Sequence, residues 1–413
     1  MLLRASSPGG ASCLTSVTEL EPACGSHASV APAKFAVGRD EKRASASVAP
    51  AKLAGRGDGK GAYAYERRYL DGEIQQAVLI DSKQSQLNRC EQALHQAIVD
   101  GHPVLSRLPR IVLTYERDGA IEEYSDVTLP HRAFDGHIRA GTVDGKPVTQ
   151  LEAYRALRDA TQANARALLD ASPVSLVFGS WDSSRAARQG RWRSVLVGEI
   201  VGFCPDDKPS LRGGARVDPV GMSIELGEKA LKELAASQRS ELSGKTYDKV
   251  MKEAEKAGDK RVSASTLGLG GIPPSLETLA GVACHRIIRS HVLSFATLRQ
   301  MRFGAGPEGD AACRALLAAL ALNALARSDA ELYLRANCDL RVASAQVVEI
   351  DQAGGGRASL SPLSIEAADA LLAAALEAAE NAAGIHWQGV ALRVTGNPAI
   401  PVGAVDEEPD GAS

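Results

Sequence analysis

Residues 77–99 combine a short apolar segment with a polar helix start, and this combination predicts a fold that contains both strands and helices. Ala77 to Ile80 is an apolar run of strand character. Asp81 or Ser82 then offers a side-chain oxygen that can cap a helix ending near Val99. Strand character returns at Ile111–Tyr115, Val174–Phe178, Val195–Phe203 and Val390–Val394. The mixture favours an α+β architecture.

Helices are expected between these strands. Apolar positions from Leu151 to Leu168 indicate one amphipathic helix that stops before Pro173. Three further segments have helical composition: Arg286–Gln300, Ala311–Arg327 and the alanine-rich segment that Ser364 can cap. Strand–helix units at both ends, with inserted helices between them, are compatible with a split, RRM-like (ferredoxin-like) core with inserted helical and hairpin elements.

Composition divides the chain into three parts. The segment before Tyr63 is rich in Ala, Ser, Gly and Pro, and such a segment cannot repay the entropy of ordering. It carries a duplicated sequence, ASVAPAKFAVGRDEK at Ala28–Lys42 and ASVAPAKLAGRGDGK at Ala46–Lys60. We therefore expect a loose arm at 1–62, an ordered domain at 63–400 with an exposed helical insertion at about 228–262, and an acidic tail at 401–413.

Charge and cysteine content narrow the class of protein. The 413 residues carry a formal net charge of −3, so the total charge does not indicate nucleic-acid binding. Only local groups of basic residues can do so, such as the arginines between Arg185 and Arg193. The seven cysteines are scattered, with no C-x-x-C pair, which argues against a disulfide framework and a zinc knuckle and favours the reducing cytoplasm. We find no secretory leader and no stretch approaching the ~20 apolar residues of a membrane span.

Two segments have the composition of a nucleic-acid contact. Asp81 to Arg89 (DSKQSQLNR) opens a helix with N–H groups, amides and cations that attract phosphate, although an ordinary solvated first turn would look the same. Phe178 to Arg193 (FGSWDSSRAARQGRWR) interleaves arginines with Trp181 and Trp192, the components of a single-strand groove. The alternative places the tryptophans in the core and pairs the arginines with surface acids.

Catalytic motifs are weak. In LPHRAFDGHIR (Leu129–Arg139) two histidines lie six residues apart without a third local ligand, so structural hydrogen bonding and RNA or subunit contact are favoured over a metal site. Gly-Lys-Thr at 244–246 lacks the first glycine of a P-loop, because Arg239 occupies that position. Cys284 and His285, adjacent in an expected helix, indicate a buried inert pair rather than a nucleophile and its base.

Several motifs, in their order along the chain, resemble one family. They are VLIDSKQSQLNRCE (Val78–Glu91), LPHRAFDGHIR (Leu129–Arg139), FGSWDSSR to GEI (Phe178–Ile200), RGGARVDP (Arg212–Pro219), GLGGIPP (Gly268–Pro274) and LSFATLRQMRF (Leu293–Phe303). The family is the backbone RAMP-superfamily subunit of type I-G (formerly I-U) CRISPR effector complexes. The arm before Tyr63, the lysine-rich stretch after Glu228 and the tail have no matching motif.

The resemblance implies an RRM-like palm, several copies of which assemble head to tail along one CRISPR guide RNA. Its implied partners are the guide RNA, the target DNA strand by way of the guide, further copies of itself, the large subunit and the guide-handle-binding subunit. No membrane, cofactor, metal or catalytic activity is implied. Specificity would reside in the guide, so the protein need contact only backbone and shape. A thumb-like hairpin would interrupt the guide–target duplex, but the motifs do not locate it.

The resemblance also implies contact residues for the guide. They are Ser82, Lys83, Gln84, Gln86, Asn88 and Arg89 on the first helix, a second group of His131, Arg132, Trp181, Arg185, Arg191 and Arg193, and then Arg212 and Arg216. A loop with Gly268, Gly270, Gly271 and Pro273 is expected to approach RNA or a neighbouring subunit. Two alternatives stay open: a RAMP-type endoribonuclease using Asp135 with His131 or His137, and an interaction scaffold without RNA contact.

Overall fold

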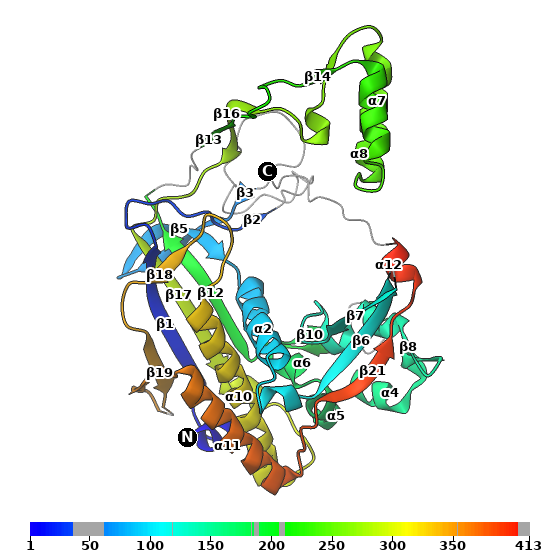
Figure 1. The fold of residues 1–413 in the computed structure, drawn as a ribbon. Helices are drawn as coiled ribbons and strands as arrows, with labels where there is room; N and C mark the ends of the chain where they lie inside the picture. Colours follow the sequence, from blue (N-terminus) through cyan, green and yellow to red (C-terminus); the bar gives the residue numbers. More distant parts are fainter. Residues whose placement is uncertain are drawn as a thin grey trace. The chain divides into compact units, whose positions relative to one another are not determined.

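The computed structural model describes residues 1–35, 62–117, 119–182, 184–185, 190–205, 211–352 and 354–403 (Figure 1). The chain divides into two compact units. The first comprises Met1–Asp207 and Val282–Ala412, and the second is essentially Lys208–Gly281. Helices and antiparallel sheets occur in both units, which confirms the predicted α+β class.

An eight-stranded antiparallel sheet forms the frame of the first unit. Its strand order is β20-β19-β1-β17-β12-β5-β4, and β18 also pairs with β1. The strands are β1 (Cys13–Pro22), β4 (Tyr65–Leu70), β5 (Glu73–Asp81), β12 (Leu196–Phe203), β17 (Arg286–Ser294), β18 (Leu340–Val342), β19 (Val347–Asp351) and β20 (Arg357–Leu360). In chain order, β1, α2, β12, β17, α10 and β19 give the spatial order β19-β1-β17-β12, and the β4–β5 hairpin is inserted between β1 and α2.

The position of β1 corrects the expectation of a loose arm. β1 lies between β17 and β19 and pairs with both, and the short helix α1 (Leu2–Ser6) precedes it. Arg299 anchors this segment, because its Nη1 donates to the carbonyl oxygens of Ala5 (2.7 Å) and Ala11 (2.6 Å). The inward positions of β1 include Ser16 and Thr18, so its hydrophobic alternation is incomplete. Residues 36–61, which hold most of the duplication, lie outside the described residues.

Three helices pack together in the first unit: α2 (Lys83–Val99), α10 (Gly306–Glu331) and α11 (Ile365–Ala383). α2 contacts β12 and α10, while α10 contacts α11 (Figure 1). Contrary to the sequence expectation, α10 is long and apolar enough to cross a membrane by length and composition. Its most apolar window is wholly buried inside the protein, and a core helix that is apolar all round has this composition.

A second sheet in the first unit has the order β7-β6-β21-β8-β9. Its strands are β6 (Arg110–Arg117), β7 (Ala120–Ser125), β8 (Thr142–Val143), β9 (Lys146–Pro147) and β21 (Val390–Thr395). β21 runs parallel to β6, so the end of the chain completes a sheet begun near residue 110. The strands expected at Ile111–Tyr115 and Val390–Val394 are confirmed.

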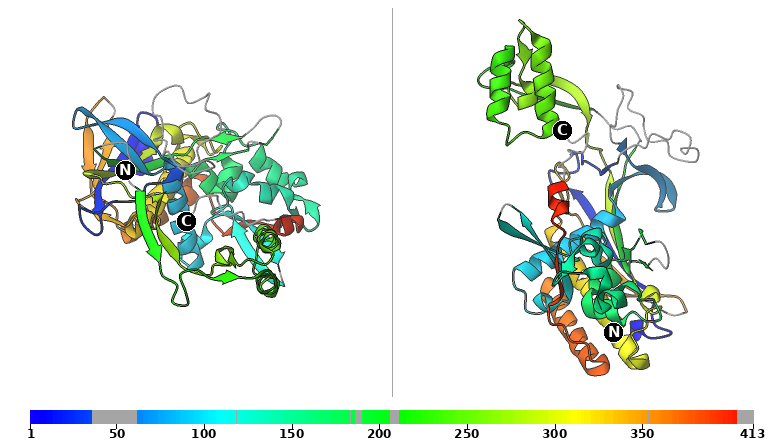
Figure 2. Two further views of the ribbon diagram at one scale, coloured as in Figure 1. Left: turned by 90° about the horizontal axis from the view of Figure 1, so that it is seen from above. Right: turned by 90° about the vertical axis from the view of Figure 1, so that its right-hand side faces the viewer.

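The second unit has its own small core. Two ribbons, β13 (Leu211–Arg216) with β16 (Ile272–Leu279) and β14 (Glu225–Leu226) with β15 (Val262–Ser263), accompany helices α7 (Glu228–Ser237) and α8 (Gly244–Ala257). The two helices pack side by side (Figure 2). Leu231, Ala235, Val250, Ala254 and Ala264 form the buried cluster. The helices expected in this region are confirmed, and Gly-Lys-Thr at 244–246 is simply the start of α8.

Three secondary-structure predictions are wrong. Arg286–Gln300 is not a helix but β17 followed by the short α9 (Phe295–Leu298), and Cys284 and His285 lie just before that strand. Cys284 is buried as expected, whereas His285 is exposed, with Nε2 3.0 Å from Gln75 Oε1. The expected strand Val174–Phe178 is helix α6 (Pro173–Val177), since Pro173 suits the first helical turn, and the single helix before Pro173 is two, α4 (Glu152–Arg158) and α5 (Arg166–Ala171).

Candidate nucleic-acid interface

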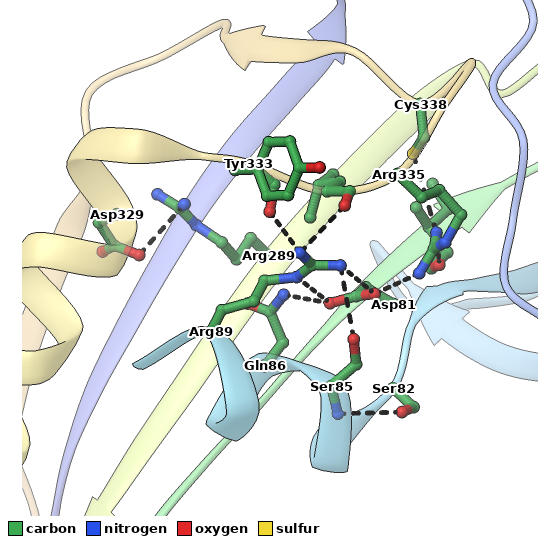
Figure 3. Close-up of polar contacts among 12 residues, drawn as sticks. Asp81, Ser82, Ser85, Gln86, Arg89, Arg289, Asp329, Tyr333, Arg335 and Cys338 are labelled. Carbon is green, nitrogen blue, oxygen red and sulfur yellow. Dashed lines mark hydrogen bonds and ion pairs between the residues drawn. The ribbon is translucent and has the colours of Figure 1, made fainter. Parts of the chain in front are cut away.

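A buried carboxylate organises the junction between β5 and α2. Ser82 caps α2 by accepting from Ser85 N (3.2 Å). Asp81 is fully buried, and its Oδ2 accepts from Gln86 Nε2 (2.5 Å) and Arg89 Nε (3.0 Å). Arg335 donates to the other carboxylate oxygen (Figure 3). Burial by itself would raise the Asp81 pKa, but the bonds from Arg89 and Gln86 and the two arginine charges hold it below its ordinary value.

This network divides the predicted contacts on α2 into two kinds. Gln86 is only 3% exposed and turns toward Asp81, so it presents no free group at the surface. Arg89 is half-buried, and its Nη1 also donates to the carbonyl oxygens of Tyr333 (2.5 Å) and Leu334 (3.1 Å). The prediction of these two as guide contacts is therefore not supported by their placement. Exposed side chains at the helix start are Lys83, Gln84 and Asn88.

Arg132 joins three of the sequence motifs in one place. Its guanidinium donates to both carboxylate oxygens of Glu91 on α2, at 2.5 and 2.7 Å, and to the carbonyl oxygen of Gly179 at 2.8 Å. It also lies 5.9 Å from the ring centroid of Phe178. Burial raises the Glu91 pKa despite this pairing. Arg132 is thus a largely buried connector, and this placement does not favour its predicted contact with RNA.

The carboxylate of Asp135 caps a helix. Its oxygens accept from the backbone N–H groups of His131 (3.0 Å) and His137 (2.9 Å), at the start of α3 (Gly136–Ala140). His131 is exposed, and His137 Nδ1 lies 2.7 Å from the Tyr115 hydroxyl. Across the described ranges, no group of three or more His, Cys, Asp and Glu side chains is placed to hold a metal ion.

The tryptophan–arginine segment forms a small hairpin. β10 (Ser180–Trp181) pairs with β11 (Arg191–Trp192), which puts Trp181 opposite Arg191. The Arg191 guanidinium lies 4.8 Å from the Trp181 ring centroid, and Trp181 is 43% exposed. Trp192 is in the core, so each of the two interpretations holds for one tryptophan. Arg193 is exposed.

Arg185 is held by its neighbours rather than open on the hairpin. Its guanidinium donates to the Arg158 carbonyl oxygen (3.0 Å) and to Asp159 Oδ1 (2.8 Å). These bonds tie the hairpin to the end of α4. Its guanidinium therefore already has an anionic partner, as the alternative interpretation of the arginines expected.

In the second unit, the two remaining motifs meet in one ribbon. Arg212 and Arg216 lie on β13, where Arg216 is exposed and the side chain of Arg212 is outside the described part. Asp218 Oδ2 accepts from Gly270 N (2.9 Å) and so binds the two motifs together. Gly268 and Gly270 have positive φ angles, and a Cβ at Gly271 would lie 2.7 Å from the Arg216 carbonyl oxygen. Pro273 is not in a loop as predicted but exposed on β16.

An exposed apolar cluster lies at the end of this ribbon, and no sequence motif predicted it. Its side chains are 48–84% exposed: Val217, Val220, Met222 and Ile272. Asp218 accepts a hydrogen bond from Val220 N (2.8 Å), and Gly271 N donates one to the Met222 carbonyl oxygen (3.0 Å). These hydrogen bonds hold the backbone beneath the cluster in place. Two apolar residues around the Asp-Pro turn were the signal for it in the sequence.

Comparison with known protein families gives a match over part of the chain. Residues 14–204 match the family model described as CRISPR-associated protein GSU0053. The matched segment runs from β1 to the end of β12 and includes Asp81, Arg132 and the β10–β11 hairpin. No curated protein matches the chain. This match supports the interpretation of the chain as a CRISPR-associated protein.

Proposed function

We propose that this protein is the guide-RNA-binding backbone subunit of an RNA-guided CRISPR effector complex. Several copies would lie head to tail along one guide RNA and present it for pairing with the target DNA strand. In this proposal the split sheet with α2 and α10 is an RRM-like palm of the RAMP superfamily, the complex is of type I-G, and it acts in the cytoplasm without cleaving RNA. The large subunit and the guide-handle-binding subunit would be its protein partners.

The Trp181–Arg191 pair is the observation that carries the proposal. An exposed indole beside a guanidinium offers a base a stacking surface and a phosphate a cation, which are the two contacts that a single-stranded nucleic acid needs. Arg132 ties this hairpin to α2 through Gly179 and Glu91. The tie gives the hairpin and α2 a fixed geometry within one unit, as a regular RNA track requires.

The β13–β16 ribbon is our candidate for the thumb. Its exposed Val217, Val220, Met222 and Ile272 resemble the apolar wedges with which proteins part stacked bases. Asp218 fixes the backbone beneath them through its bonds to Val220 N and Gly270 N. A rigid apolar end on a ribbon suits a wedge that interrupts a duplex.

The experiment that tests the assignment is isolation of the protein with its partners from cells that carry a CRISPR array. We expect array-derived RNA, intact, with several copies of the protein on each guide by mass. A monomer without RNA in the presence of the partner subunits would overturn the proposal. Shortened RNA, with cleavage abolished by Asp135→Asn, would favour the endoribonuclease alternative instead.

Variants of the hairpin test direct contact. Arg191→Ala with Arg193→Ala should weaken RNA binding and reduce the salt slope by ~0.7 for each phosphate that the protein no longer neutralises. The matched control is Arg357→Ala. Arg357 is an exposed arginine on the edge strand β20 and pairs with Glu349, and its replacement should change neither the RNA affinity nor the salt slope. Unchanged affinity in the hairpin variant would favour a scaffold without RNA contact.

A further inference from the structure

A groove of about 610 Å³ lies between α2 and the end of α10, wholly within the first unit. Its lining includes Asn88, Arg89, Gln92, Gln96, Arg327 and Tyr333. Asn88 alone among the exposed members was expected to contact RNA. Its lining on α2 starts at Ser85, two residues after Lys83, so the groove continues along the same helix as the predicted phosphate contact.

Tyr333 stands at the edge of this groove with its side chain in solvent. It is 80% exposed, although the backbone beneath it is firmly held. Leu332, with φ of 42°, ends α10 in the left-handed region, and the carbonyl oxygens of Tyr333 and Leu334 both accept from Arg89. Arg89 is fixed by Asp81 (Figure 3). A ring on such a fixed backbone loses little entropy when it stacks on a ligand.

An uncharged stripe of amides runs along the exposed side of α2. Gln84, Asn88, Gln92 and Gln96 are spaced by four residues and are all exposed. This spacing places them near one face of the helix. Each amide both donates and accepts hydrogen bonds, which suits a ribose 2′-hydroxyl or a base edge.

The charges in the groove do not favour a phosphate. Arg89 is paired with buried Asp81, and Arg327 is paired with Asp369 at 2.6 Å. Two acidic side chains, Asp100 and Glu331, also line the groove. A cavity with an exposed aromatic ring, amides and two acids beyond its paired arginines suits a neutral planar group better than an anion.

We propose that this groove holds one unstacked nucleotide of the guide RNA, with its base on the Tyr333 ring and its ribose or base edge bonded to Asn88 and Gln92. The inference rests on the proposed function and adds to it a base-stacking site distinct from the phosphate contacts. It also assigns binding roles to Gln92 and Tyr333, which sequence motifs did not indicate.

The test is ultraviolet crosslinking of the guide-bearing complex, followed by mass spectrometry of the crosslinked peptides. We expect a guide nucleotide on the peptide that contains Tyr333, retained in Tyr333→Phe and lost in Tyr333→Ala. Guide release into excess competitor RNA should be at least roughly fivefold faster for Tyr333→Ala, since loss of one stacked base weakens binding by roughly 5- to 150-fold. Because stacking involves no phosphate, that ratio should not change with salt.

Tyr69→Ala is the matched control, a 74% exposed tyrosine on β4 that should leave release unchanged. If the complex carries guide RNA but the Tyr333 peptide never crosslinks and Tyr333→Ala releases guide at the wild-type rate, the groove inference fails while the proposed function stands. A crosslink from Tyr333 to another protein, in place of a nucleotide, would show that the groove binds a peptide and would overturn the groove inference. A complex without RNA would sink both proposals.

Discussion

At the scale of single residues, Asp81 connects the start of α2 to the turn after α10. It is the shared anion for Arg89 and Arg335, and all three groups are wholly or partly buried. Removing one partner of a buried ion pair leaves an uncompensated charge, which is far more costly than losing an exposed pair. Asp81 therefore matters to stability as well as to the placement of Tyr333.

Asp81→Asn should lower the free energy of unfolding by about 3–5 kcal/mol, because two guanidinium groups lose their counter-charge. Urea denaturation of the wild type and the variant measures this loss. Asp71→Asn is the control, since Asp71 is exposed and its 3.0 Å pair with Arg286 should contribute no more than about 1 kcal/mol. Equal losses in the two variants would contradict the buried network.

His291 gives the fold a dependence on pH. It is buried on β17 against Gly198, where a Cβ would lie 1.9 Å from the imidazole Cδ2. Burial, helped by the positive charge of Arg289, lowers the His291 pKa from 6.5 to about 3. The unfolded chain therefore takes up this proton more readily than the folded protein. The resulting stability is complete above the unfolded pKa and is lost as the pH falls toward the folded one.

Comparison with His291→Asn isolates this contribution from that of other titrating groups. The difference in unfolding free energy between wild type and variant should shrink by about 2 kcal/mol from about pH 7.5 to about pH 5. Urea melts at the two pH values measure it. A difference that does not vary with pH would mean that His291 is not kept neutral by burial.

At the scale of elements, the sequence predicted those whose signals are local. α2 and α11 begin where a serine was expected to cap them, since Ser82 and Ser364 accept from N–H groups three residues onward. β17 was mistaken for a helix because Arg289 and His291 occupy two of its inward positions. Arg289 can be buried there because Asp329 of α10 lies 3.1 Å away, and no local pattern reveals that partner.

In the candidate interface too, the sequence predicts the placement of residues with local signals but not of those that depend on a distant partner. Exposure of Lys83, Trp181 and Arg191 follows from a polar helix start and a turn-rich segment, both of which are visible in sequence. The inward placement of Arg132 depends on Glu91, and the tether of Arg185 depends on Asp159. A cation-rich motif therefore does not show which of its arginines is already paired with an acid from another element.

Helices α7 and α8 of the second unit should be able to unfold while the first unit stays folded. Val250 is buried in a small cluster confined to this unit, so Val250→Asp should melt α7 and α8 and open them to protease. Lys249→Asp on the exposed side of the same helix is the control. Limited proteolysis with mass mapping should show cuts within 228–257 in the first variant alone, and loss of the whole protein to protease would contradict separate cores.

At the scale of the whole molecule, the second unit interrupts the first between adjacent strands. Phe203 of β12 pairs with Arg286 of β17, so the chain leaves and re-enters the first unit close together. We expect that replacing residues 208–281 with a short Gly/Ser linker leaves the first unit folded, with a cooperative thermal transition by circular dichroism. An insoluble product, or loss of the transition, would show that the first unit needs the second.

The central place of β1 has a consequence for synthesis of the protein. β1 ends at Pro22, but its neighbours β17 and β19 begin at Arg286 and Val347. At roughly 5–20 residues per second, the ribosome needs roughly 13–50 s to reach β17 after finishing β1. During that interval both edges of β1 lack their partners, and unpaired edges invite aggregation. A message broken before the codon for Arg286 would therefore yield chains without a finished sheet, and we expect proteases to degrade them.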